Sequence, residues 1–369
     1  MKVPFLNLKR AHDEVRSEMI SAFTEVYDSN YFILGDRLEH FEELFGSYIG
    51  AQHAIGVSSG LDALVLALRA LEIGPGDEVL VPSNTYIASV LAVSHVGATP
   101  VFIEPDPRTY NVTSDGLMKA VTSKTKAIIP VHLYGQCCEM EGIMELAHTK
   151  GLYVVEDNAQ SHGASYKGKV AGSWGHINAT SFYPGKNLGA LGDGGGVTTD
   201  QPEHAETIQK LRNYGSTVKY ENDVLGYNCR LDEMQAAFLS IKLGSLPHWT
   251  RQRQDAAAIY SSKLKDVGDL ILPYTAAHST HVYHLYVIRS KHRDELQSFL
   301  NDSGVGTLIH YPIPPHRQNA YAHLNMEKGR LPIAEEFAST CLSLPIYPGI
   351  KEEEIAFVCD KIKAFFSRQ

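Results

Sequence analysis

A lysine in a glycine-rich turn is the residue of this sequence with the clearest chemistry. The segment SFYPGKNLGALGDGGG, residues 181–196, contains Lys186 and follows an apolar run that predicts a strand over Ile177–Ser181. Small neighbours allow a lysine to be buried beside a ligand, and burial lowers its pKa because desolvation disfavours the ammonium. A neutral amine is what a Schiff base requires. Alternatively, Lys186 is an ordinary surface-loop lysine, as most lysines are.

A carboxylate ends another strand, in the segment VVEDNAQSHG, residues 154–163. Asp157 stands where a strand is buried, and a buried carboxylate is costly unless it is paired. The protonated pyridine nitrogen of pyridoxal phosphate (PLP) is a suitable partner, because that ion pair keeps the ring able to accept electrons. Gln160 and His162 could hydrogen-bond the ring hydroxyl or line the pocket. Equally, Asp157 could cap a turn or a helix, and His162 could have a purely structural role.

A strand, a turn and a helix start make up the segment GVSSGLDAL, residues 56–64. Backbone N–H groups at a helix N-terminus bind phosphate, and Gly60 and Leu61 would supply them. Many strand-to-helix turns look alike, so this motif is weak by itself. Tyr86 follows the next strand and could stack on a planar ring, or it could simply pack. Together the segments would supply a phosphate cradle, an aromatic platform, an acid and a lysine, each just past a different strand.

Alternating strands and helices must position these residues. Apolar runs predict strands over 54–58, 79–82, 100–103, 127–132 and 152–156, and helical spacing predicts helices over 60–71, 86–95 and 140–150. Such alternation indicates βαβ units, and hence an α/β fold with a mostly parallel sheet covered on both faces. Ligands of such sheets bind at the carboxyl ends of the strands, which is where the polar segments lie.

The pattern changes after Arg230. An apolar stripe at helical spacing predicts a core-facing helix, with residues off the stripe on its polar side; the stripe is Leu231, Met234, Phe238 and Ile241, and the polar residues are Asp232, Glu233 and Lys242. We expect Pro247 to end this helix. Later patterns predict helices over 251–264, 293–300 and 352–366 and a strand over 282–288. The sequence therefore predicts a large domain over residues 1–246 and a smaller α+β domain over 247–369.

Composition restricts the class of protein. The chain has 369 residues and a net charge of −9, which disfavours a nucleic-acid partner because phosphate backbones need a basic face. No apolar run approaches the roughly 20 residues that span a bilayer, and the start MKVPFLNLKR has no apolar signal-peptide core. Five cysteines without a C-x-x-C pair argue against a disulfide framework or a metal site. We expect a soluble cytoplasmic protein.

Over nearly its whole length the sequence resembles the DegT/DnrJ/EryC1/StrS family of sugar aminotransferases. The segments that carry the resemblance are VPFLNLKR, YFILGDRLEHFEELF, SSGLDAL, PSNTYIAS, EDNAQSHGA, SFYPGKNLGALGDGG, GYNCRLDEMQAA and HYPIPPHRQNAY. The resemblance implies the aspartate aminotransferase-like fold (PLP fold type I). It also implies that the protein transfers an amino group to a keto sugar carried by a nucleotide.

The family's cofactor site can be carried over residue by residue. The resemblance implies that Lys186 bonds to the cofactor, that Asp157 pairs with the pyridine nitrogen and that Gln160 contacts the ring hydroxyl. It implies a phosphate site made by Ser181, Gly60 and Leu61, and a stacking role for Tyr86. Asn228 would reach the phosphate of the neighbouring subunit's cofactor in a homodimer with shared sites; without the resemblance it reads as a turn residue. One departure is Leu61, where the family often has threonine, so that only the backbone N–H remains.

The substrate is a softer inference from the same resemblance. HYPIPPHRQNAY is most similar to members that act on dTDP-3-oxo-6-deoxyhexoses, with glutamate as the amino donor. Candidate sugar-nucleotide contacts are Tyr183, Lys219, Tyr220 and His310, although Lys219 could equally be a solvated surface lysine. A 4-oxo sugar aminotransferase, a PLP-dependent sugar dehydratase and a catalytically silent PLP-binding relative are the alternatives. Dehydratase members have histidine in place of the lysine, so Lys186 favours amino transfer.

Overall fold

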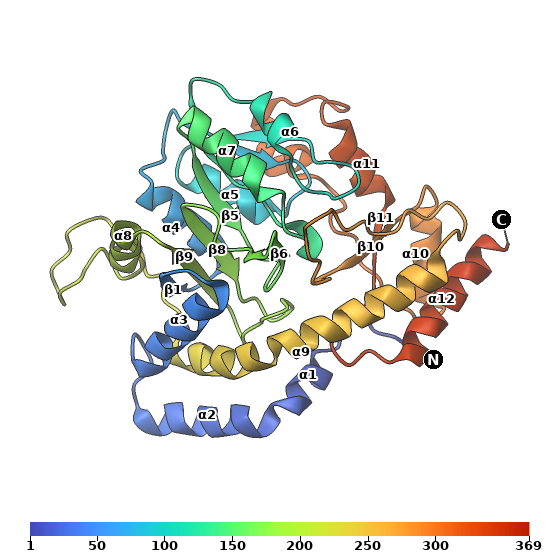
Figure 1. Ribbon diagram of the computed structural model, residues 1–369, viewed down its shortest axis with the longest axis horizontal. Helices are drawn as coiled ribbons and strands as arrows, with labels where there is room; N and C mark the ends of the chain where they lie inside the picture. The colour runs from blue at the N-terminus through green and yellow to red at the C-terminus, as the bar shows by residue number, and fades with distance from the viewer. Residues whose placement is uncertain (369) are drawn as a thin grey trace.

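A seven-stranded sheet forms the centre of the computed structural model, which describes residues 1–368 (Figure 1). The strand order is β1-β9-β8-β5-β4-β2-β3, and β9 alone runs against the other strands of this sheet. The bounds are β1 His53–Val57, β2 Glu78–Pro82, β3 Thr99–Ile103, β4 Thr125–Ile128, β5 Tyr153–Asp157, β8 Ile177–Ser181 and β9 Gly195–Thr199. The mostly parallel sheet expected from the sequence is confirmed.

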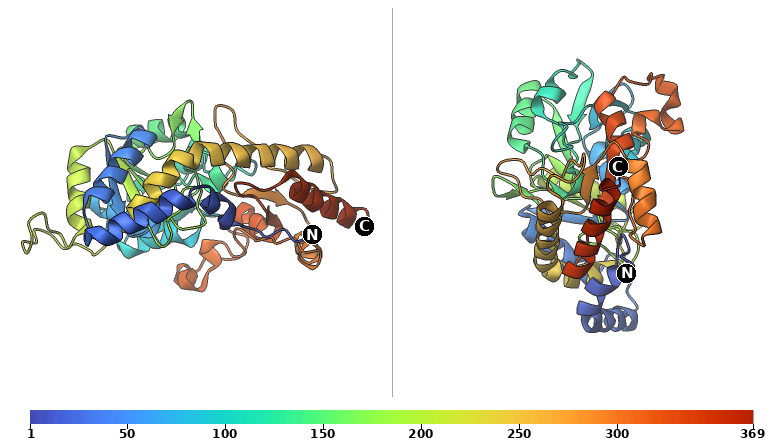
Figure 2. Two further views of the ribbon diagram at one scale, coloured as in Figure 1. Left: turned by 90° about the horizontal axis from the view of Figure 1, so that it is seen from below. Right: turned by 90° about the vertical axis from the view of Figure 1, so that its right-hand side faces the viewer.

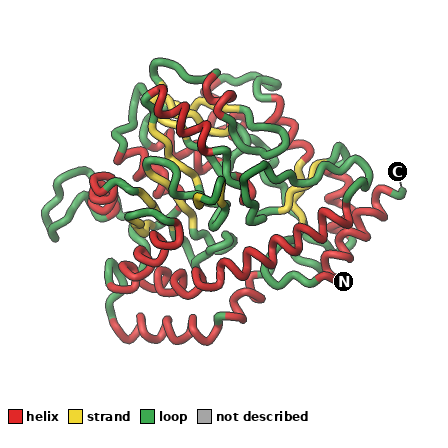
Figure 3. The backbone as a smooth tube through the Cα atoms, viewed as in Figure 1, coloured by secondary structure: helices red, strands yellow, loops and turns green. Residues whose placement is uncertain are grey.

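Helices cover both faces of this sheet (Figure 3). One face carries α4 (Gly60–Ala70), α5 (Ile87–His95) and α8 (Pro202–Arg212). The other carries α3 (Asp36–Ile49), α6 (Ser114–Met118) and α7 (Met140–Lys150). Strand alternation explains the two cores: Val79 and Val81 point to the α4 side, whereas Leu80 between them points to the α7 side. Burial on both faces gives the nearly continuous apolar runs seen in the sequence.

A second, smaller core lies at the C-terminal end (Figure 2). It forms between the end of α9 (Glu233–Leu264), α10 (Arg293–Asp302), α12 (Glu352–Phe366) and the antiparallel pair β10 (Tyr286–Arg289) and β11 (Cys341–Leu344). The remaining elements are α1 Leu8–Glu14, α2 Arg16–Ser29, β6 Ser165–Tyr166, β7 Lys169–Val170, α11 Pro332–Thr340 and three short 3₁₀ turns at Leu133–Gly135, Pro315–Arg317 and Asn319–Leu324. The small α+β part of the prediction is therefore present.

The predicted helix end at Pro247 is wrong. α9 is 32 residues long, continues through the proline and joins the two halves of the molecule. An internal proline costs about 3 kcal/mol, because it removes a backbone hydrogen bond and crowds the preceding turn. Burial on both sides compensates: Leu246 is fully buried, and Trp249 is buried and donates its indole N–H to Glu14 at 2.8 Å. The division at residues 246 and 247 stays a prediction, and Val3, at the other end of the chain, packs in the small core.

The N-terminal half of α9 is more buried than its sequence pattern predicts. Leu231 and Phe238 of the apolar stripe are buried as expected, but Glu233 and Lys242, expected on the polar side, are each only 3% exposed. The reason is that both α2 and α3 pack against this part of α9. Glu233 accepts hydrogen bonds from backbone N–H groups at the start of α3, at Gly35, Arg37 and Leu38. Lys242 donates to the carbonyl of Gly189 in the Lys186 loop.

β9 was not predicted, because its sequence begins with glycines. A Cβ at Gly195 would collide with the backbone of Ser59, so these glycines let β9 lie against the start of α4. The predicted strand over 127–132 is shorter in the structure, since β4 ends at Ile128, although Val131 still bridges to Asp157.

None of the helices within residues 1–368 combines the length and apolarity needed to cross a membrane.

Candidate functional site

A cavity of about 840 Å³ opens at the carboxyl ends of β2, β5 and β8. Its walls come from both parts of the chain. Asp157 and Lys186 belong to the large sheet and its loops, whereas Arg253 and His310 come from α9 and the C-terminal part. The cavity thus lies where the sequence analysis expected ligands, at the strand ends of a parallel sheet.

Lys186 lies in the connection between β8 and the antiparallel β9. Its backbone N–H bonds to the carbonyl of Tyr183 at 2.8 Å, which folds the loop into a turn. The side chain is half-buried and lines the cavity. Burial lowers the pKa of its amine to about 8, although the negative charge of Asp157 acts in the opposite direction. About a tenth of the amine is therefore neutral at pH 7, far more than for an ordinary lysine, and covalent chemistry with a carbonyl group requires this neutral form.

Asp157 ends β5 and is 5% exposed. Its carboxylate accepts the hydroxyl of Ser89 at 2.7 Å and the backbone N–H of Ala159 at 3.1 Å. Within residues 1–368 no lysine, arginine or histidine approaches it closely enough for an ion pair. A buried carboxylate held by two neutral donors has room for a cationic partner from a ligand.

Gly60 and Ser181 form the floor of a small cradle at the start of α4. A Cβ on Gly60 would lie 2.6 Å from the Cβ of Ser181, so this close approach requires glycine. Ser59 caps the helix by accepting the N–H of Asp62 at 3.1 Å. The N–H groups of Gly60 and Leu61 precede the first helical hydrogen bond and have no acceptor in the described part of the chain. Such a helix start suits a phosphate group.

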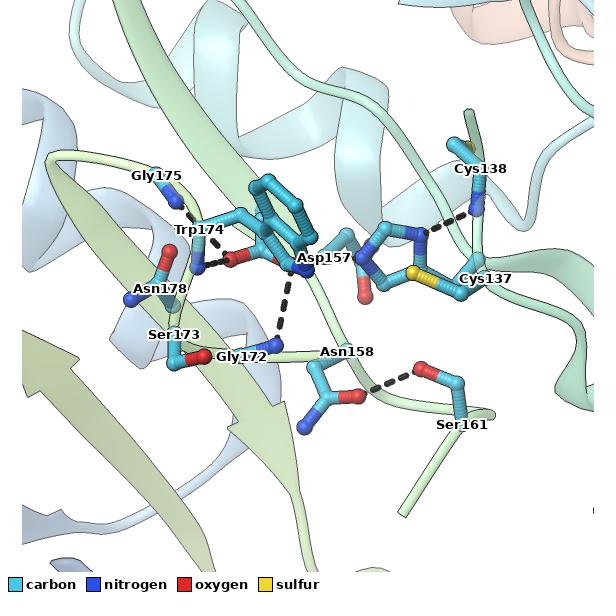
Figure 4. A network of polar contacts seen from close by, with 12 residues as sticks. Cys137, Cys138, Asp157, Asn158, Ser161, Gly172, Ser173, Trp174, Gly175 and Asn178 are labelled. Atoms are coloured by element: carbon cyan, nitrogen blue, oxygen red, sulfur yellow. Dashed lines mark hydrogen bonds and ion pairs between the residues drawn. The ribbon is translucent and has the colours of Figure 1, made fainter. Parts of the chain in front are cut away.

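A buried polar network supports the end of β5 from the opposite face (Figure 4). Glu156 is fully buried and accepts three backbone N–H groups, from Gly172 at 2.9 Å, Trp174 at 2.5 Å and Gly175 at 2.9 Å. It also receives the Nε2–H of His132 at 2.6 Å. Burial alone would raise the pKa of Glu156. The contacts with His132 and the backbone N–H groups outweigh burial and lower the pKa below its usual value, so the carboxyl stays ionised. Strand alternation places Glu156 on one face of the sheet and Asp157 on the other.

Aromatic and amide groups form another wall of the cavity. Tyr86 directly precedes α5, is 54% exposed, and lies with its ring centroid 5.3 Å from that of Tyr311. Gln160 donates to the hydroxyl of Tyr311 at 2.9 Å and accepts the backbone N–H of Tyr134 at 2.7 Å. Both side chains predicted here, Tyr86 and Gln160, line the cavity.

Three histidines near Lys186 are uncharged. Burial lowers the pKa of His310 to about 4 and that of His162 to about 3, and the charge of Lys186 adds to both effects. Burial also holds the pKa of His284 well below its usual value. His310 lines the cavity and contacts the hydroxyl of Ser343 at 2.8 Å. His162 instead bonds to the backbone carbonyl of Ser181 at 2.9 Å and is not part of the cavity wall, which is the structural role left open above.

The remaining predicted residues lie farther out. Tyr183 is 59% exposed and stands at the cavity wall. Lys219 and Tyr220 belong to the loop between α8 and α9 that projects past α8 away from the sheet (Figures 1 and 2), and Asn228 lies at the base of that loop, where it bridges to Asn213. All three are exposed, and none lines the cavity of its own chain.

The cavity wall includes polar residues that were not found from the sequence, among them Ser89, Arg253, His284 and Tyr311. Ser89 is one helical turn after Tyr86, so the segment PSNTYIAS carried a signal that could have been read. Tyr311 directly follows His310 in a segment that the resemblance did single out. Arg253 and His284 gave no local signal, because only the tertiary fold brings α9 and the segment before β10 to the cavity.

These groups fit pyridoxal phosphate. The cradle at Gly60 and Ser181 matches a phosphate, and the unpaired carboxylate of Asp157 matches a pyridinium nitrogen. Lys186 offers an amine of lowered pKa in the same cavity. A crystal structure from Bacillus subtilis with its cofactor bound as PMP has a TM-score of 0.92 to this chain and 32% identity, covering 99% of this chain and 85% of its own.

Comparison with known proteins gives consistent results. A transaminase for dTDP-3-amino-3,4,6-trideoxy-α-D-glucose from Streptomyces venezuelae is 50% identical over 369 residues, which is 100% of this chain and 97% of its own. A transaminase for dTDP-3-amino-3,6-dideoxy-α-D-galactopyranose from Aneurinibacillus thermoaerophilus is 49% identical, covering 98% of this chain and 99% of its own. The crystal structure of S. venezuelae DesV in complex with a ketimine intermediate has a TM-score of 0.98 and 49% identity, covering 100% and 99%. The model of the DegT/DnrJ/EryC1/StrS aminotransferase family matches residues 13–363, and the chain belongs to that family.

Proposed function

We propose that this protein transfers an amino group from glutamate to a dTDP-linked 3-oxo-6-deoxyhexose and so forms the 3-amino sugar. The observation that carries the proposal is the pairing, in one cavity, of the Lys186 amine of lowered pKa with the cation-free carboxylate of Asp157. The names of two relatives that are about half identical over their full lengths support the choice of acceptor.

The chain's own residues would divide the work as follows. PLP supplies an electron sink when bound, and Asp157 would keep its ring nitrogen protonated. Lys186 Nζ would take the proton from the α-carbon of the donor and deliver it to the reactive carbon of the cofactor. The lowered pKa values of His284 and His310 make both rings weak bases, so Lys186, whose pKa is about 8, is the stronger base in this part of the cavity. Donor and acceptor would use the cavity in turn, which predicts ping-pong kinetics.

The acceptor's sugar would lie against Tyr183 and His310, which line the cavity. Its diphosphate would need cationic and hydrogen-bonding groups from outside the chain's own cavity. We assign that role to Lys219 and Tyr220 of a neighbouring subunit, because both are exposed on the projecting loop. Asn228 of the same loop would reach the neighbour's cofactor phosphate.

A homodimer would explain why this loop exposes large apolar side chains among its polar ones. Tyr220 is 88% exposed and Leu225 is 96% exposed. On α2, Phe23 is half exposed and Tyr27 is more than half exposed. Large apolar side chains gathered on a surface mark interaction sites. The five free cysteines are compatible with the cytoplasm, which we propose as the compartment.

The test is to offer two substrates separately with glutamate, dTDP-3-oxo-6-deoxyhexose and dTDP-4-oxo-6-deoxyglucose, and to locate nitrogen in the product by NMR. A misplacement of about 1 Å can cost on the order of 100-fold in rate, so one regioisomer should be strongly preferred. Nitrogen at carbon 4, with no turnover of the 3-oxo sugar, would refute the acceptor. Loss of water without gain of nitrogen would indicate a dehydratase, and cofactor binding without glutamate consumption would indicate a silent relative.

A further inference from the structure

Lys242 is a buried lysine that contacts the loop carrying Lys186. It lies on α9 and is 3% exposed. Its Nζ donates to the backbone carbonyl of Gly189 and lies 3.2 Å from Nε2 of His12 on α1. An ammonium group only donates hydrogen bonds, so His12 accepts through a neutral ring, whose pKa is lowered by burial and by the charge of Lys242. Both partners of the Lys242 amine are therefore uncharged.

Stability does not explain a lysine at this position. Leu239, Leu243 and Leu246 of the same helix are buried apolar side chains. Burial lowers the pKa of Lys242 to about 8, and no carboxylate of residues 1–368 pairs with the amine to raise it again. A buried charge without a counter-charge is costly, and neutral acceptors offset that cost only in part. The group that Lys242 holds, the carbonyl of Gly189, is the better explanation.

Gly189 closes the turn that carries Lys186. The turn begins with the hydrogen bond from the N–H of Lys186 to the carbonyl of Tyr183 at 2.8 Å. A Cβ on Gly189 would lie 2.5 Å from the carbonyl oxygen of Pro184, so the chain folds back on itself at this point. Because the turn is this compact, a side chain that holds the Gly189 carbonyl also restricts how the rest of the turn lies.

Gln235 holds the next part of the loop from the same helix. Its Oε1 accepts the backbone N–H of Leu191 at 2.8 Å. Gln235 and Lys242 are about two helical turns apart, so their side chains leave the same face of α9. α9 thus binds the end of the Lys186 loop through one donor and one acceptor.

We infer that Lys242 is a positioning residue for Lys186: its ammonium holds the Gly189 carbonyl, and this contact sets where the Lys186 amine lies in the cavity. The inference rests on the proposed role of Lys186 as the base and does not depend on the identity of the sugar. A displacement of about 1 Å in a reacting group can cost on the order of 100-fold in rate. Lys242 does not line the cavity, so loosening the turn should slow proton transfer without weakening substrate binding.

The holoenzymes of Lys242→Met, Gln235→Leu and the control Lys263→Met, a partly exposed lysine near the other end of α9, test this inference. Single-turnover amino transfer from glutamate, without sugar, is followed by the absorbance of the cofactor. Lys242→Met should lower the maximal rate by about 10- to 100-fold and change the half-saturating glutamate concentration by less than about 3-fold. Gln235→Leu should lower the rate less, because its hydrogen bond joins two neutral groups. The control should stay within about 3-fold of wild type.

Two further measurements separate a positioning role from a general loss of structure. The visible circular dichroism of the bound cofactor depends on how the cofactor lies against Lys186, and it should change in Lys242→Met but not in the control. The urea midpoint of the apo-protein should stay close to that of wild type in Lys242→Met, because removing a buried charge offsets the lost hydrogen bonds.

Three results would overturn the inference: an unchanged maximal rate in Lys242→Met, a rise confined to the half-saturating glutamate concentration, or a slower rate that merely follows a lowered urea midpoint. If Lys242→Met does not fold, Gln235→Leu decides, and a wild-type rate with unchanged dichroism in that variant would overturn the inference instead. Glutamate reacts in the absence of sugar. A wild type that reacts with glutamate but aminates no keto sugar would therefore refute the proposed acceptor and leave the role of Lys242 standing.

Discussion

Replacing Glu156 by glutamine should destabilise the protein strongly, although the two side chains have nearly the same shape. In the wild type one carboxylate oxygen accepts Gly172 N–H and His132 Nε2–H, and the other accepts the N–H groups of Trp174 and Gly175. Glutamine offers one oxygen and one NH2 group. Whichever way the amide is turned, its NH2 group replaces one carboxylate oxygen, and the two buried N–H groups that this oxygen accepted lose their acceptor.

A change of histidine tautomer cannot relieve this conflict. The Nδ1 of His132 already accepts the backbone N–H of Cys138 at 3.0 Å, so moving the proton to Nδ1 only shifts the clash to that end of the ring. Each buried donor left without an acceptor costs about 1–3 kcal/mol, which gives about 2–6 kcal/mol for Glu156→Gln. That is a large part of the net stability of about 5–15 kcal/mol typical of folded proteins.

Urea unfolding of the apo-protein, followed by circular dichroism at neutral pH, measures this difference. Glu353→Gln is the matched control: Glu353 is exposed and lies 3.5 Å from Lys351, so its loss should cost less than about 1 kcal/mol. The folded-state pKa of Glu156 lies below its usual 4.5, so its charge stabilises the fold above that pH. This stabilisation is lost as the pH falls through the folded-state pKa of Glu156. The difference in free energy of unfolding between wild type and Glu156→Gln should therefore narrow in that pH range. A Glu156→Gln protein as stable as Glu353→Gln at neutral pH would refute this reasoning.

Four further outcomes are expected. Lys186→Ala should abolish amino transfer and leave the circular dichroism unchanged, and borohydride should fix the cofactor to Lys186 in the wild type; a label on another lysine would disprove the assignment. Because the neutral amine reacts, the rate at which apo-protein takes up pyridoxal phosphate should rise with pH and level off above about 8, the pKa of Lys186, and stopped-flow absorbance would reveal a different midpoint. Gly60→Ala should cost about 1–3 kcal/mol of stability in thermal unfolding and weaken cofactor retention, since its Cβ would lie 2.6 Å from that of Ser181. Asn228→Ala should weaken cofactor retention by about 1–3 kcal/mol in dialysis of the dimer, whereas a fully active monomer in sedimentation would exclude the shared site.

Between residues 53 and 181, the six strands of the large sheet and the helices α4, α5 and α7 could be predicted because local patterns decide them, whereas the short elements α6, β6 and β7 were not predicted. The strands there are buried on both faces and read as apolar runs, and their helices carry clear apolar stripes. Lys186 and Asp157 stood out for a related reason, since Asp157 ends such a strand and Lys186 lies in the loop that follows another. Their meeting in one cavity follows from parallel strands, whose carboxyl ends share an edge of the sheet.

Other features depend on contacts that no local pattern records. The run of α9 through Pro247 is stabilised by α1 and α2, which are distant in sequence and pack around Trp249. Arg253 reads as one more charge on a polar helix until the fold buries it. β9 begins with two glycines, which in a sequence suggest a loop, yet here Gly195 allows close contact with Ser59.

Because α9 is continuous, a small rotation about one end of the helix produces a larger displacement at the other end. Arg253 is about 20 residues along this helix from Glu233, which corresponds to about 30 Å at 1.5 Å per residue. A tilt of about 2° about the Glu233 end would therefore move Arg253 by about 1 Å, a displacement that can change rates on the order of 100-fold. Glu233 anchors that pivot through the N–H groups that begin α3. Substitutions at the pivot, far from the cavity, are thus a means by which related proteins could adjust the position of Arg253 in the cavity wall without altering any residue that lines the cavity.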